Sequence, residues 1–113
     1  MADIRADGGL VTFINMFSCD PGDQQALLRT LRSETEDVVS KIDGFVSASL
    51  HASTDGRRVI NYAQWTHLDA FNAMMAGEQG RQMIEAVHQY ATAIDIHLYD
   101  VSWQAEAAKA AAR

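Results

Sequence analysis

The sequence is poor in cysteine, in positive charge and in long apolar runs, and each shortage excludes a class of protein. Cys19, the one cysteine among 113 residues, can form neither an internal disulfide nor a multi-cysteine zinc site, which is typical of a reducing cytoplasm. Nine Lys and Arg against 15 Asp and Glu leave a net charge of −6, and the scattered basic residues argue against a nucleic-acid partner. No apolar run approaches a membrane span, and residues 1–9 hold no hydrophobic signal core. We therefore expect a cytoplasmic protein without nucleic-acid or membrane partners.

The composition that remains is that of an ordinary globular domain. Hydrophobic residues make up 48% of the chain and charged residues 21%, which excludes disordered and fibrous classes. The length suits one core, because two domains of half this size would each be close to the limit of independent stability. We expect a single domain over residues 1–113, with its core at about 10–103. The Ala-rich residues 104–113 are expected to form a frayed helix or a disordered tail.

Hydrophobic periodicity predicts alternating strands and helices. Runs of period two with β-branched and aromatic residues indicate strands, and apolar stripes at spacings of three and four indicate helices. Asp20 to Asp23 form a turn that leads into the first helix, Thr66 to Asp69 resemble a capping box, and Gly77 and Gly80 break or bend the second helix. The predicted strands are 10–17, 45–53, 58–65 and 94–103, and the predicted helices are 24–42 and 67–87.

This order of elements, βαββαβ, predicts the α+β ferredoxin-like fold, an antiparallel four-stranded sheet with the helices on one face. The other face is then too apolar for open water on a small domain. A homodimer that packs sheet against sheet is the simplest cover, and a C-terminal tail folded over this face is the alternative. The residues expected on the open face are Ile14, Met16, Val46, Ala48, Leu50, Ile60 and Tyr62.

Two asparagines and one tryptophan are predicted to face the helices. Asn61 and Trp65 lie four residues apart on one strand and so share a face, and Asn15 lies between two phenylalanines on the first strand. A buried amide is costly without a hydrogen-bond partner, so the three side chains together indicate a cavity for a polar, partly aromatic ligand. The alternative is that the amides bind backbone groups and Trp65 packs in the core.

The face of His51 depends on the length of the hairpin loop around the Asp55-Gly56 pair. An even loop turns His51 away from Asn61, whereas a three-residue loop ending in a Gly56 bulge turns it toward Asn61. We predict the three-residue loop, which pairs His51 with Val59, Ser49 with Asn61 and Phe45 with Trp65.

The remaining candidates for chemistry are weak. The other histidines do not have the spacing of metal ligands, so we expect no metal site. The Gly77 to Gly80 stretch lacks the preceding strand and the Lys of a phosphate-binding loop. The methionines are interpreted first as core filler.

The hairpin sequence His51-Ala-Ser-Thr-Asp-Gly-Arg-Arg-Val-Ile-Asn-Tyr-Ala-Gln-Trp65 closely resembles that of the antibiotic biosynthesis monooxygenase superfamily, most of all its actinorhodin-type branch. The resemblance extends from about Leu10 to Val101, with its specific part in the hairpin. It implies a dimeric ferredoxin-like fold. It also implies oxidation of anthrone-type tricyclic phenols to quinones by O2, without metal, flavin or haem.

The resemblance also implies roles for individual residues. Asn61 and Asn15 would donate N–H bonds to a developing oxyanion, Trp65 would stack on the substrate ring, and His51 would act as general base. Phe71 stands where the actinorhodin-type enzyme has Tyr, and Glu85 falls near a family Arg that Arg81 could replace. The implied substrate-binding residues are Phe13, Phe71, Met74, Met83 and Arg81.

Two other functions remain open at this point. A haem-degrading relative would need an axial His on the helix after Trp65, where the sequence has Phe71, Met74 and Met75, with His88 only later. A non-catalytic binding or stress-related dimer would have a cavity too small for three fused rings, or one filled by methionine.

Overall fold

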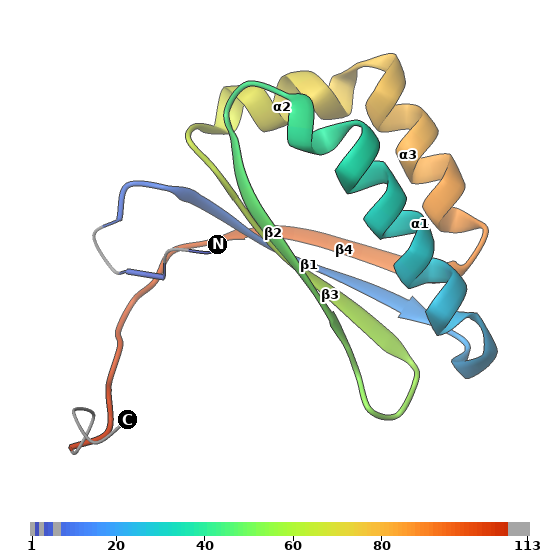
Figure 1. Ribbon diagram of the computed structural model, residues 1–113, viewed down its shortest axis with the longest axis horizontal. Helices are drawn as coiled ribbons and strands as arrows, with labels where there is room; N and C mark the ends of the chain where they lie inside the picture. The colour runs from blue at the N-terminus through green and yellow to red at the C-terminus, as the bar shows by residue number, and fades with distance from the viewer. Residues whose placement is uncertain (1, 3, 6–7, 109–113) are drawn as a thin grey trace.

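The computed structural model describes residues 2, 4–5 and 8–108, and its elements follow the predicted order (Figure 1). Two short 3-10 segments join the predicted elements, and the second helix is divided in two. The elements are β1 (Val11–Cys19), η1 (Pro21–Asp23), α1 (Gln24–Asp37), η2 (Val39–Lys41), β2 (Phe45–Ala52), β3 (Arg58–Trp65), α2 (Leu68–Ala76), α3 (Glu78–His88) and β4 (Ala91–Tyr99).

The strands form one antiparallel sheet in the order β2-β3-β1-β4, and all three α-helices cover the same face of it (Figure 1). This arrangement confirms the predicted ferredoxin-like fold. The central pair, β1 and β3, runs in unbroken register from Val11 opposite Trp65 to Ser18 opposite Arg58. Side chains of β1 that face the helices therefore lie opposite those of β3 that do the same.

Several helices and strands begin or end at other residues than predicted, because contacts with other parts of the chain set their bounds. β4 was predicted over 94–103 but spans Ala91–Tyr99, because the pairing with β1 runs from Cys19 to Thr12 and the strand pattern beyond Tyr99 has no partner. The first helix ends at Asp37 rather than 42, and a 3-10 turn follows. The second helix begins at Leu68, and its N-cap is His67, one residue after the Thr66 that opens the predicted capping box. The His67 imidazole accepts the Ala70 N–H at 3.2 Å.

The predicted hairpin loop is wrong. Ala52 pairs with Val59 and His51 with Ile60, so the loop is even and His51 lies on the sheet face away from the helices. Side chains close the loop: the Asp55 carboxylate accepts the Arg57 N–H and the Ser53 hydroxyl accepts the Arg58 N–H, each at 2.9 Å. These bonds stabilise a four-residue loop in place of the expected three-residue bulge.

A bulge in β2 explains why one predicted pairing still holds. The register shifts between Phe45 and Ser47, so Phe45 does lie opposite Trp65 as predicted. Beyond the bulge the predicted faces of β2 are reversed. Ala48 and Leu50 face the helices, whereas Ser47 and Ser49 lie on the open face.

The open face keeps an apolar centre. Ile14 lies opposite Tyr62 and Met16 opposite Ile60, as expected, and all four side chains are partly buried. Within the described residues no helix is long and apolar enough to cross a membrane. Of the predicted tail, residues 109–113 lie outside the described residues, and 104–108 form no helix or strand.

The amide of Gln24 joins α1 to the hairpin. Its Nε2 donates to the backbone oxygens of Ser53 and Arg58, each at 3.0 Å, and its side chain is buried. This contact holds the start of α1 over the β2–β3 end of the sheet.

We expect Gln24→Ala to lower the free energy of unfolding by about 1–2 kcal/mol, because both hydrogen bonds are lost from a buried site. Urea denaturation measures the effect, and Gln25→Ala at the exposed neighbouring position should stay within about 0.5 kcal/mol of the parent protein. Equal losses in the two variants would contradict this role for Gln24.

Candidate functional site

Two amides lie side by side in the middle of the sheet, on the face covered by the helices. Asn15 on β1 pairs with Asn61 on β3, and Asn15 is only 6% exposed. The Oδ1 atoms of both residues are buried and accept no hydrogen bond from the part of the protein that the structure describes. Since a buried polar atom without a partner costs about 1–3 kcal/mol, this arrangement is unfavourable for folding and points to a ligand.

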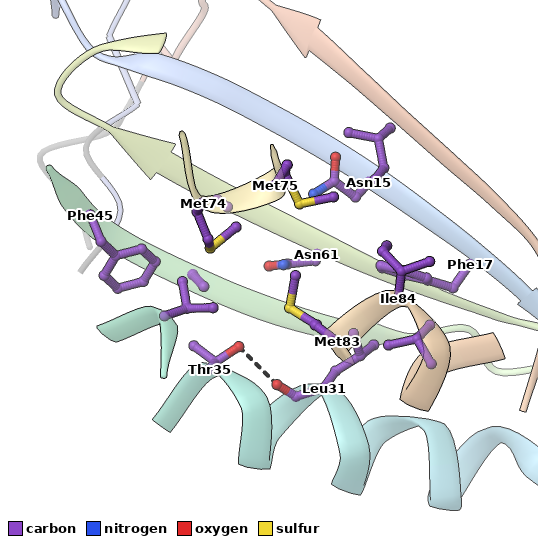
Figure 2. Close-up of a pocket in the computed structure, with 15 residues that line it drawn as sticks. Asn15, Phe17, Leu31, Thr35, Phe45, Asn61, Met74, Met75, Met83 and Ile84 are labelled. Atoms are coloured by element: carbon purple, nitrogen blue, oxygen red, sulfur yellow. Dashed lines mark hydrogen bonds between the residues drawn. The ribbon is translucent and has the colours of Figure 1, made fainter. Parts of the chain in front are cut away.

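A small apolar pocket lies between these amides and the helices (Figure 2). Its volume is about 50 Å³, room for a few water molecules and far less than ligand pockets of roughly 300–1,000 Å³. Apart from the two amides and Thr35, its lining is apolar. The described residues that line it are Asn15, Phe17, Leu31, Thr35, Val39, Phe45, Ala48, Asn61, Ala63, Met74, Met75, Met83, Ile84, Val87 and Ile96.

Helix α1 supplies the one other polar side chain. The Thr35 hydroxyl donates to the backbone oxygen of Leu31 at 2.8 Å, one turn earlier (Figure 2). With its proton engaged, the hydroxyl oxygen retains only its capacity to accept. The pocket therefore offers three acceptor oxygens, those of Asn15, Asn61 and Thr35, in apolar surroundings.

Trp65 lies beside the pocket rather than on its surface. It is 1% exposed, and its ring makes edge contacts with Phe45 at 5.5 Å and with Phe71 at 5.8 Å between centroids. Phe13 stacks on Phe71 at 3.9 Å. Of these four rings only Phe45 lines the pocket, so Trp65, Phe13 and Phe71 support its wall from behind.

The charged candidates lie away from the pocket. His51 is exposed on the open sheet face, opposite to its predicted direction. Arg81 is exposed on α3 and pairs with Glu78, and Glu85 is exposed as well. Consequently no titratable side chain is among the described residues that line the pocket. No group of three or more His, Cys, Asp and Glu in the described ranges is placed to hold a metal ion.

Several lining residues were absent from the predicted site. Met75 lies one helical turn after Phe71, but the sequence gives no sign that it faces a cavity. Thr35 lies one helical turn after Leu31 on α1, and its polar group beside an apolar position was the available signal. Phe45, Ala48, Ile84 and Ile96 are apolar and indistinguishable from core by sequence alone.

Replacement of either asparagine by leucine, which has a similar shape, should stabilise the fold. We expect Asn15→Leu and Asn61→Leu each to raise the free energy of unfolding by about 1 kcal/mol, because an unpaired buried oxygen is removed. Urea denaturation tests this, with Asn72→Leu on the exposed surface of α2 as control. A loss of stability in both buried variants would show that the amides support the fold.

Cavity size alone favours the non-catalytic dimer, since three fused rings do not fit in about 50 Å³ and Met74 and Met83 line the space.

The comparisons with known proteins favour catalysis. Residues 10–86 match the family model described as antibiotic biosynthesis monooxygenase. Over 76 residues the chain is 43% identical to tetracenomycin-F1 monooxygenase from Streptomyces glaucescens, covering 67% of this chain and 68% of that protein.

Solved structures of two oxygenases have the same fold. The monooxygenase from the gene ActVA-Orf6 of Streptomyces coelicolor, in complex with nanaomycin D, has a TM-score of 0.74 at 26% identity, covering 87% of this chain and 91% of that one. SnoaB, a cofactor-independent oxygenase from Streptomyces nogalater, shares the fold at a TM-score of 0.66 and 24% identity, covering 86% of this chain and 97% of that one. The chain is therefore an oxygenase, and it belongs to the antibiotic biosynthesis monooxygenase family.

Proposed function

We propose that this protein is a cofactor-independent monooxygenase that oxidises an anthrone-like polycyclic phenol to a quinone with O2. The observation that carries the proposal is the pair of buried, unpartnered amide oxygens of Asn15 and Asn61 in an otherwise apolar pocket. Such a site suits a flat aromatic ring that bears hydroxyl or carbonyl groups on one edge.

The reaction can be balanced from substrate and O2 alone. An anthrone loses a proton from its benzylic CH2 to give an electron-rich enolate, which passes electrons to O2. Combination at that carbon gives a hydroperoxide, and loss of water leaves the quinone carbonyl. One oxygen atom enters the product and the other leaves as water. The substrate itself supplies the electrons, so this chemistry does not depend on a bound redox group.

Each asparagine amide has a donor and an acceptor to offer this substrate. The Oδ1 atoms accept the O–H of a phenolic substrate, which supplies the two buried oxygens with donors that no described group of the protein provides. As negative charge develops on the enolate oxygen, an amide N–H of Asn15 or Asn61 donates to it. Because the surroundings are apolar and the amides are fixed by the sheet, this stabilisation is electrostatic and preorganised.

Trp65 acts in this proposal as a positioning residue. Its edge contact supports Phe45, which forms the pocket wall. Phe13 and Phe71 support Trp65 in turn, so these predicted substrate contacts act through the wall.

No general base is among the described residues that line the pocket, and His51 lies on the other face of the sheet. Proton loss then depends on the acidity of the substrate, raised by the amides, with water as the acceptor. The rate should follow ionisation of the bound substrate rather than that of a histidine.

The relatives suggest which substrate to try first. A protein 43% identical to this chain is a tetracenomycin-F1 monooxygenase, which makes tetracenomycin F1 the first candidate beside simple anthrones. We place the reaction in the cytoplasm, where a reducing environment suits the free, buried thiol of Cys19.

We also propose that the working form is a homodimer joined through the open sheet faces. Ile14, Met16, Ile60 and Tyr62 form the apolar centre of this face and lack a covering layer of helices (Figure 1). Ser49 and His51 on one side, and on the other His97 and Asp95, whose Nε2 and Oδ1 atoms lie 2.6 Å apart, give it a polar rim. An apolar centre within a polar rim is the usual composition of a protein interface.

Asn61→Leu should lower kcat/KM for an anthrone or tetracenomycin F1 by about 10²–10³, because a group that stabilises the oxyanion is lost. Asn15→Leu should show a loss of the same kind. Oxygen uptake and quinone absorbance measure both effects, with His51→Ala as the matched control. The control should keep the parent rate within about twofold, with the same pH profile. Full activity in both asparagine variants, or loss of activity in His51→Ala alone, would refute the proposed roles.

Ile60→Asp should weaken the dimer at least 100-fold, because it buries an unpaired carboxylate at the centre of the interface. Sedimentation equilibrium measures the dissociation constant, and circular dichroism verifies the fold. The matched control is Gln79→Asp, an exposed position on α3. A monomeric parent protein, or equal association of both variants, would contradict the interface.

A further inference from the structure

Three methionines line the pocket that the proposed substrate would enter. A cavity of roughly 150 Å³ is needed to hold a single benzene ring, whereas this pocket measures about 50 Å³. An aromatic substrate of three or four rings therefore enters only if part of the lining moves. The part that moves is the one held by the weakest contacts.

The floor of the pocket is held in place by the sheet. Asn15 and Asn61 belong to the two central strands, and each of these strands is paired on both sides. The α1 wall is held by Leu31, which is 5% exposed in the core, and by the two hydrogen bonds of Gln24. Neither side can move without breaking backbone pairing or these buried contacts.

The opposite side of the pocket is formed by flexible side chains. Met74 and Met75 from α2 and Met83 from α3 lie around the amides of Asn15 and Asn61 (Figure 2). Methionine is unbranched, with three rotatable bonds, and repacks at low cost. Met75 and Met83 are only partly buried, and Met83 contacts both hydrophobic clusters of the core.

The backbones beneath these side chains are tightly joined. A Cβ on Gly80 would lie 2.5 Å from the Met74 backbone oxygen and 2.7 Å from the Met75 Cα, so α3 rests directly on the last turn of α2. Separation of the two helices would lose this close contact. Rotation of the methionine side chains is the smaller change that enlarges the pocket.

We propose that Met74, Met75 and Met83 form an adjustable roof that determines which ring systems the pocket accepts. This inference rests on the proposed function. Substrate rings displace the three thioethers from the space above the amides, and the volume into which they repack sets the upper limit on ring size. Truncation of the roof should then favour larger ring systems over smaller ones.

The test measures binding without turnover. The probes are 2-hydroxyanthraquinone, with three rings, and 2-hydroxytetracene-5,12-dione, with four. Both are already quinones, and each carries one hydroxyl group too far from its own carbonyls for an intramolecular hydrogen bond, so that this group can donate to the amides. Isothermal titration calorimetry on the parent protein, Met75→Ala and Met83→Ala gives the affinity ratio of the two ligands. We expect each truncation to shift this ratio toward the four-ring ligand by about tenfold.

Two controls separate roof volume from general disturbance. Leu68→Ala removes a similar volume from the exposed start of α2, outside the pocket, and should leave the ratio unchanged. Met75→Leu conserves the side-chain volume and should therefore keep the affinity ratio of the parent protein. If Met83→Ala does not fold, Met83→Val gives a smaller truncation with a smaller shift in the same direction.

The outcomes distinguish the two proposals. Binding of both quinones with one ratio in all variants would overturn the roof and leave the proposed function standing. Binding of neither quinone to the parent protein, with no oxidation of an anthrone or tetracenomycin F1, would overturn the proposed function and the roof with it.

Discussion

The pairing of β1 with β3 is the constraint on which the site depends. The two central strands hold an unbroken antiparallel register, and that register places Asn15 directly opposite Asn61. Because side chains alternate with a period of two, a slip of one residue would turn one amide toward the helices and the other toward the open face. The cavity would then contain a single amide, and the pair would no longer exist.

The same pairing explains a conflict between stability and function. The fold keeps two buried oxygens without partners, in a pocket whose other lining is almost entirely apolar. A core built only for stability would have leucine at these positions. A ligand that donates hydrogen bonds satisfies the oxygens when it binds. The apolar surroundings that make the unpaired amides costly also strengthen their interaction with a charged transition state.

The small volume of the pocket is consistent with an oxygenase once the roof is considered. Fixed polar groups on a rigid sheet provide orientation, and flexible thioethers above them adapt to the ligand without separation of α2 from α3. No titratable side chain is among the described residues that line the pocket. The main contributions of the protein are then the orientation of the substrate by the fixed amides and a surrounding of low dielectric constant.

The sequence by itself determined the order of the elements, the ferredoxin-like fold and the inward direction of Asn15 and Asn61. Each follows from local periodicity, which alternation in a strand or spacing in a helix makes visible. The open-face residues Ile14, Met16, Ile60 and Tyr62 follow in the same way.

Only the tertiary structure decided the direction of His51, the place of Trp65 behind the wall and the size of the cavity. The face of His51 depends on the parity of one loop, which the side-chain hydrogen bonds of Ser53 and Asp55 settle. The position of Trp65 depends on aromatic contacts with Phe45 on β2, which is distant in sequence, and with Phe71 on α2. Cavity volume is a small difference between large packed volumes, so no local pattern encodes it.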